Sequence, residues 1–125
     1  MSCKNICKLC NHLVISNAVN FDGTANQVVI SLPAGTYNAG EKYCIVVAQS
    51  IPVPTTVNST VAVTIGTSGT RYPVQNCDCS PLTGCGIKTR TKYSTRLCIS
   101  VAGAVFKMLG KACNCEGNVA GSISG

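Results

Sequence analysis

Acidic and imidazole side chains are scarce in this chain. Its 125 residues include only four acids and one histidine, namely His12, Asp22, Glu41, Asp78 and Glu116. General acid and base catalysis draws mainly on these side chains, and here they are scattered among expected turns and loops. Nucleophile elbows, phosphate-binding glycine loops and zinc-protease motifs are missing as well. We therefore expect a protein that is not an enzyme.

Long apolar runs are also missing. The longest uninterrupted run extends from Tyr43 to Ala48, which is far shorter than the roughly 20 residues needed to cross a bilayer. The first ten residues contain no apolar segment of the kind found in secretion signals. We expect a protein that is made in the cytoplasm and has no membrane partner.

The residues that are abundant favour strands and turns. Thr, Ser, Val, Ile, Gly and Asn dominate, and alternating runs such as Gln27–Leu32 and Thr60–Ile65 are separated by turn residues. The first strand is expected from Leu13 to Phe21. The pattern predicts an all-β fold, an antiparallel β-sandwich or barrel of about seven to eight strands stapled by cysteines. We expect a single domain over residues 1–115 and a flexible Gly/Ser tail over residues 116–125.

The longest alternation runs from Ile87 to Val101. One side of it carries four basic residues, Lys88, Arg90, Lys92 and Arg96. On a single strand they would form a positive stripe of roughly 25 Å, which we predict to be the partner-binding surface. A solvated face that protects a sheet edge is the alternative. Nucleic acid is disfavoured as the partner, because Tyr93, the aromatic residue of this strand, lies on the other side and offers no stacking platform there.

Ten cysteines stand out in a chain of this length. Eight lie in three clusters outside the expected strands: Cys3, Cys7 and Cys10, then Cys77, Cys79 and Cys85, then Cys113 and Cys115. They suit two structural zinc sites, a set of disulfides, or reduced thiols, and the spacing leaves these alternatives open. His12 would serve as a further zinc ligand, but we interpret it as an ordinary polar residue. Cys44 and Cys98 lie in expected strands, as small core or sheet residues.

Four stretches carry a resemblance to a known family. They are VNFDG at 19–23, ISLPAGTY at 30–37, KYCIVVAQSIP at 42–52 and TRTKYSTR at 89–96. The chain resembles small cysteine-rich proteins from tailed phages and prophages of clostridia, which tend to be encoded beside the major capsid protein. The resemblance implies a structural protein of the virion, most simply a decoration protein on the outer capsid surface.

This resemblance also implies a partner and a location. The major capsid protein is the implied partner, and the copies are expected to be lattice-bound or homo-oligomeric on the capsid surface. One alternative is a zinc-stabilised binding module for nucleic acid or an anionic surface, and another is a redox or metal-handling protein.

Overall fold

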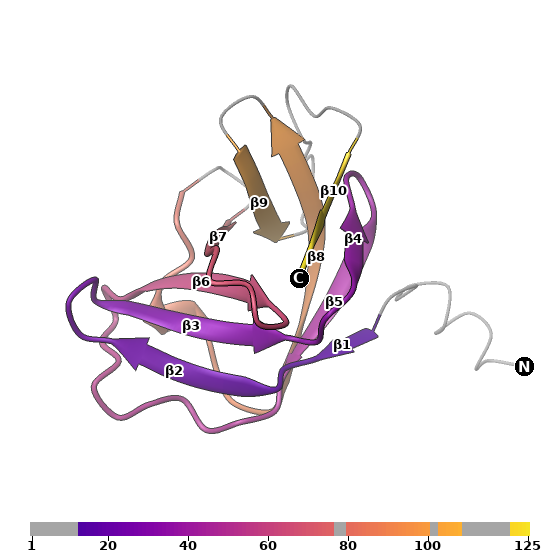
Figure 1. The fold of residues 1–125 in the computed structure, drawn as a ribbon. Helices are drawn as coiled ribbons and strands as arrows, with labels where there is room; N and C mark the ends of the chain where they lie inside the picture. The colour runs from indigo at the N-terminus through magenta and orange to yellow at the C-terminus, as the bar shows by residue number, and fades with distance from the viewer. Residues whose placement is uncertain (1–12, 77–79, 101–102, 109–120) are drawn as a thin grey trace, which may run out of the picture.

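The computed structural model describes residues 13–76, 80–100, 103–108 and 121–125, apart from the side chain of Cys85. These residues form ten strands and one short 3-10 helix (Figure 1). The elements are β1 (Leu13–Ile15), β2 (Ala18–Asp22), β3 (Gln27–Leu32), β4 (Thr36–Asn38), β5 (Lys42–Val47), β6 (Thr60–Ile65), β7 (Tyr72–Gln75), η1 (Gly84–Gly86), β8 (Thr91–Ser100), β9 (Gly103–Met108) and β10 (Ser122–Ser124).

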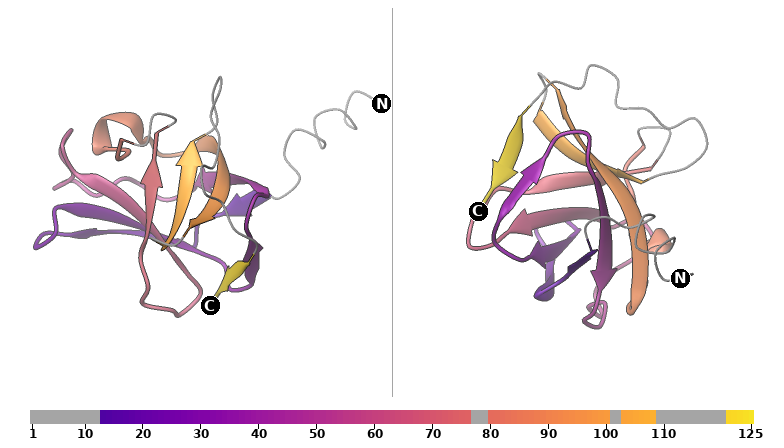
Figure 2. Two further views of the ribbon diagram at one scale, coloured as in Figure 1. Left: turned by 90° about the horizontal axis from the view of Figure 1, so that it is seen from above. Right: turned by 90° about the vertical axis from the view of Figure 1, so that its right-hand side faces the viewer.

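Eight of these strands form one mixed sheet. Its order is β1-β5-β8-β9-β7-β6-β3-β2, while β4 and β10 form a separate two-stranded sheet. The larger sheet curls into a half-barrel (Figure 2). The pairs β1 with β5, β3 with β6 and β7 with β9 are parallel, and the remaining pairs of this sheet are antiparallel. The all-β prediction is confirmed, but the purely antiparallel arrangement is wrong, because three pairs join strands that are distant in sequence and run in the same direction.

The two edge strands of the curled sheet, β1 and β2, are consecutive in the chain. The Ser16 amide donates to the Val46 carbonyl next to β1 (2.9 Å), whereas the Asn17 amide donates to the Ser31 carbonyl in β3 (2.7 Å). Ser16 Oγ also accepts a hydrogen bond from the Ala48 amide (2.9 Å). The chain therefore pairs with β5 up to Ser16 and with β3 from Asn17 onward. This switch connects the two edge strands of the sheet.

The predicted single strand from Leu13 to Phe21 is consequently two strands. Leu13 and Ile15 are 59% and 51% exposed, whereas Val14 is buried in the core. The alternating pattern groups Leu13 and Ile15 on one face with Val19 and Phe21. In the structure only Val19 and Phe21 pack against the core, because the change of neighbours at Ser16 turns Leu13 and Ile15 outward. A shift of one residue in an alternating pattern reverses which face is buried.

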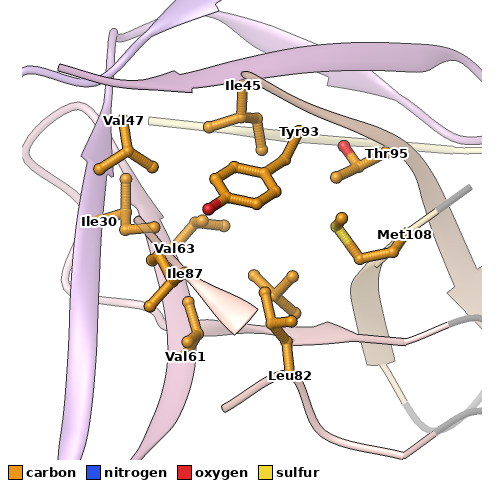
Figure 3. A pocket seen from close by; sticks show the side chains of 11 residues that line it. Ile30, Ile45, Val47, Val61, Val63, Leu82, Ile87, Tyr93, Thr95 and Met108 are labelled. Carbon is orange, nitrogen blue, oxygen red and sulfur yellow. The ribbon is translucent and has the colours of Figure 1, made fainter. Parts of the chain in front are cut away.

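One apolar core fills the concave side of the half-barrel. Its fully buried side chains include Val28, Leu32, Val47, Val61, Val63, Ile65, Leu97 and Phe106. Tyr37, Tyr43 and Phe106 pack as an aromatic cluster with ring centroids 5.0 to 6.3 Å apart, and burial raises the pKa of both tyrosines. A cavity of about 10 Å³ remains between the side chains drawn in Figure 3. A water molecule needs about that volume, so this cavity has no room for a larger ligand.

The end of the chain forms strand β10 against β4. Gly125 exchanges two backbone hydrogen bonds with Gly35, at 3.2 and 3.3 Å. A Cβ atom on Gly125 would lie 2.1 Å from the Ile65 carbonyl oxygen, so the chain end packs closely against β6. Residues 122–124 of the expected Gly/Ser tail form this strand, and residues 116–120 lie outside the described part of the chain.

Candidate functional site

The four basic residues predicted to form one stripe lie on different elements. Lys88 and Arg90 precede β8, and only Lys92 and Arg96 lie on the strand itself. Arg90 has a φ of 58°, in the left-handed region that interrupts an extended chain. Its amide donates to the Val47 carbonyl at 2.6 Å, which holds this turn against the end of β5. The predicted stripe is therefore broken between Arg90 and Lys92.

Within β8 the predicted alternation is confirmed around its middle. Thr95 and Leu97 are buried on the core side of the sheet. Lys92 is exposed and Arg96 is partly buried on the opposite, convex side, which we call the outer face. Strands β5 and β9 flank β8 on its two sides, so their outward residues determine the surroundings of these two cations.

Arg96 lies between two lysines on the outer face. It is directly opposite Lys42 of β5 and Lys107 of β9. Residues directly opposite in antiparallel strands have Cβ atoms about 4.5 to 5.5 Å apart, so the three side chains form a continuous row of cations, which we call the basic row. Lys42 is exposed, whereas Lys107 is only 6% exposed. Like charges in this arrangement lower stability.

The guanidinium of Arg96 has an unused donor. Its Nε atom is buried and has no hydrogen-bond partner. Both acids that the structure describes bind other side chains: Asp22 Oδ2 accepts from Arg71 Nη1 (2.8 Å), and Glu41 Oε2 accepts from the Asn38 side-chain amide (3.0 Å). Positive charge together with a free guanidinium N–H is the chemistry that binds carboxylates and other oxyanions.

Two exposed apolar side chains lie near the basic row on the same outer face. Leu13 of β1 is in register with Cys44 of β5, and Ile15 is in register with Val46, whose partner in β8 is Lys92. Residues paired in this way project to the same face of a sheet. The outer face therefore combines cations with exposed aliphatic surface.

The cysteine clusters fall almost entirely outside the described residues. This holds for His12 and for Cys3, Cys7, Cys10, Cys77, Cys79, Cys113 and Cys115, while Cys85 contributes only its backbone, in η1. Within the described part of the chain, no group of His, Cys, Asp and Glu could hold a metal ion. Cys44 and Cys98 are buried in β5 and β8, and both are disulfide-bonded.

Sequence reasoning missed Lys42 and Lys107. Each lies in a short strand with no other cation, so no local pattern relates it to Arg96. The sequence shows only that Lys42 directly precedes the apolar run Tyr43–Ala48 and that Lys107 lies within an expected strand from Val105 to Leu109. Pairing between distant strands brings them together, and alternation within one strand does not reveal that pairing.

A hollow of about 380 Å³ lies between β1 and β4. Its lining contains no charged side chain and consists of Leu13, Val14, Ala34, Gly35, Thr36, Tyr37 and Tyr43. The basic row offers more specific chemistry than this hollow, and we therefore take the outer face as the candidate site.

Comparisons with known proteins identify no relative of this chain. No protein-family model, curated protein or solved structure matches it. No helix in the described residues is long and apolar enough to cross a membrane.

Proposed function

We propose that this chain is a non-enzymatic structural protein of a virion, most simply a decoration protein that binds the outside of a tailed-phage capsid. The observation that carries the proposal is the basic row on the outer face, next to exposed Leu13 and Ile15. The resemblance of the sequence to phage head-associated proteins supports the same function. Side chains fill the core apart from a cavity of about 10 Å³, so we expect the partner to bind at the surface.

Electrostatics gives this proposal a mechanism. The chain has a net charge of +6, which attracts an acidic surface before specific contacts form. Lys42, Lys92 and Arg96 then meet the acidic groups of the major capsid protein at close range. Screening by salt weakens attraction between exposed charges, so attachment is expected to fall as the salt concentration rises.

The test uses capsids that lack this protein and measures how much added protein co-sediments with them. Replacing Lys88, Arg90, Lys92 and Arg96 together by Ser should weaken attachment, and most strongly at low salt. Two double variants separate the contributions, because K88S/R90S and K92S/R96S remove the same net charge from different places. We expect K92S/R96S to lose more binding, since Arg96 belongs to the basic row and Lys92 lies on the same outer face. Unchanged binding of K92S/R96S would rule out this surface.

We also propose that cysteines staple the fold. Cys44 is in register with Ser94, four residues before Cys98 on β8, a separation of about 13 Å along the strand. A disulfide needs Cα atoms about 4.4 to 6.8 Å apart, so Cys44 and Cys98 are too distant to bond each other. We propose that each is bonded to one of the eight clustered cysteines, and that the remaining clustered cysteines form further disulfides or bind structural zinc.

Intact mass measurement after alkylation in denaturant, without reduction, tests the stapling. A buried thiol reacts once the chain is unfolded, whereas a disulfide-bonded cysteine does not, so two such disulfides allow at most six of the ten cysteines to be alkylated. Metal analysis of the native protein reports zinc, and ten added groups together with no zinc would refute the staple.

A further inference from the structure

We propose that Arg96 and Lys42 form a binding site for a carboxylate, supplied by an acidic side chain of a partner protein whose neighbouring apolar side chains pack on Leu13 and Ile15. This inference deepens the proposed function, because it names the chemistry of the contact. It rests on the arrangement of the outer face and does not require that the partner be a capsid.

The first support is the geometry of the cations. Arg96 and Lys42 are directly opposite each other on neighbouring strands. The Leu97 amide donates to the Glu41 carbonyl at 3.1 Å, which makes the next pair along, Arg96 with Lys42, a non-hydrogen-bonded pair of the ladder. Side chains approach most closely in such pairs. A single carboxylate placed over this pair would contact both cations.

The second support is the unsatisfied donor. Arg96 Nε has no acceptor and is buried in the unbound chain, although buried polar groups in proteins are nearly always hydrogen-bonded. The partly exposed Arg96 side chain must turn outward for a partner's carboxylate to reach Nε. A carboxylate provides two oxygens, which match two N–H groups of a guanidinium. Lys107 flanks the site and strengthens its positive potential, but it has an interaction of its own and is not counted as a ligand.

The third support identifies the partner as a protein rather than a nucleic acid. Single-stranded nucleic acids bind proteins through basic grooves that also carry aromatic stacking platforms. The outward residues of β8 include no aromatic side chain, and the Tyr93 ring lines the core cavity instead (Figure 3). Exposed Leu13 and Ile15 on the neighbouring strand offer aliphatic contacts, which suit a protein surface.

The experiment titrates the full protein with the capped peptide acetyl-Leu-Glu-Leu-Glu-Leu-amide and follows the Nε–H resonance of Arg96 by NMR. The matched control peptide has Gln in place of both Glu. We expect the Glu peptide, and not the Gln peptide, to shift this resonance. The R96K variant keeps the charge but loses Nε and the planar fork, and it should bind the Glu peptide about tenfold more weakly. R71K, the same change on the Asp22 pair, should bind like the unaltered protein.

Three results would overturn the site. They are an Arg96 resonance that does not move, equal shifts with both peptides, and equal loss of affinity in R96K and R71K. A short oligothymidylate serves as a third probe, and tighter, Arg96-dependent binding of it than of the Glu peptide would replace the carboxylate by a nucleic-acid phosphate. The peptide titration contains no capsid, so its result does not depend on the decoration function. The co-sedimentation assay tests capsid attachment separately, so the failure of either proposal can be told from the failure of the other.

Discussion

Arg96 has two features that lower the stability of the fold, and the proposed contact with a carboxylate would relieve them. It lies opposite Lys42 and Lys107 and leaves a buried Nε–H without an acceptor. Like charges opposite each other are destabilising, and an unsatisfied buried donor costs about 1 to 3 kcal/mol. An acidic partner relieves both costs on binding, which gives the contact a driving force that an ordinary exposed arginine lacks.

Asp22 shows the opposite case, a charge that is satisfied within the fold. The hydrogen bond from Arg71 is the main cause that holds the pKa of Asp22 below its usual value, and the amides of Ala25 and Thr24 also donate to it. A lowered folded pKa contributes stability that is fully present above the unfolded value of about 3.9 and is lost as pH falls through the folded value.

The D22N variant should therefore respond less to acid than the unaltered protein. Urea midpoints measured at about pH 6 and about pH 3 provide the comparison. We expect the unaltered protein to lose more stability between these two conditions than D22N. Equal losses would show that this carboxylate does not contribute to acid sensitivity.

At the scale of elements, the start of β8 depends on the conformation of Arg90. Its φ of 58° costs an L-residue roughly 1 to 2 kcal/mol, while glycine adopts it freely but loses more entropy on folding, about 0.5 to 1 kcal/mol. R90G should range from unchanged stability to a gain of about 1 kcal/mol, and R90V should lose roughly 1 kcal/mol, because branching at Cβ adds steric conflict. Thermal or urea unfolding measures both, and a more stable R90V would contradict the assigned turn.

The loop before β6 is fixed against η1 by a close backbone approach at Gly84. The Gly84 amide donates to the Ser59 carbonyl at 2.7 Å, and a Cβ on Gly84 would lie 2.2 Å from the Thr56 carbonyl oxygen. G84A should therefore destabilise the fold by roughly 1 to 3 kcal/mol. G69A is the control, because a Cβ there meets nothing within 4 Å. Equal unfolding midpoints for the two variants would argue against this packing.

Local pattern predicts individual strands well and their pairing poorly. The runs Gln27–Leu32 and Thr60–Ile65 are strands with the predicted bounds, because alternation records which face of each is buried. The change of neighbours at Ser16 and the three parallel pairs depend on contacts between distant segments. The basic row was missed for the same reason, since Lys42, Arg96 and Lys107 meet only through register.

At the scale of the whole molecule, the apolar core stabilises the fold, and the outer face carries the cations of the basic row. The core cavity between the described side chains measures about 10 Å³ and has no room for a ligand larger than water. The curled sheet holds the cations of β5, β8 and β9 on one rigid face, and rigid elements position binding groups more accurately than loops do. This arrangement is consistent with a protein whose role is attachment.

The proposed function places this chain on the surface of a capsid. Quantitative mass spectrometry of gradient-purified virions, prepared from the source of the chain, tests this proposal. We expect the chain to be present at a fixed copy number relative to the major capsid protein. Its absence from purified virions would contradict the decoration function and leave the carboxylate site as a feature of a different binding protein.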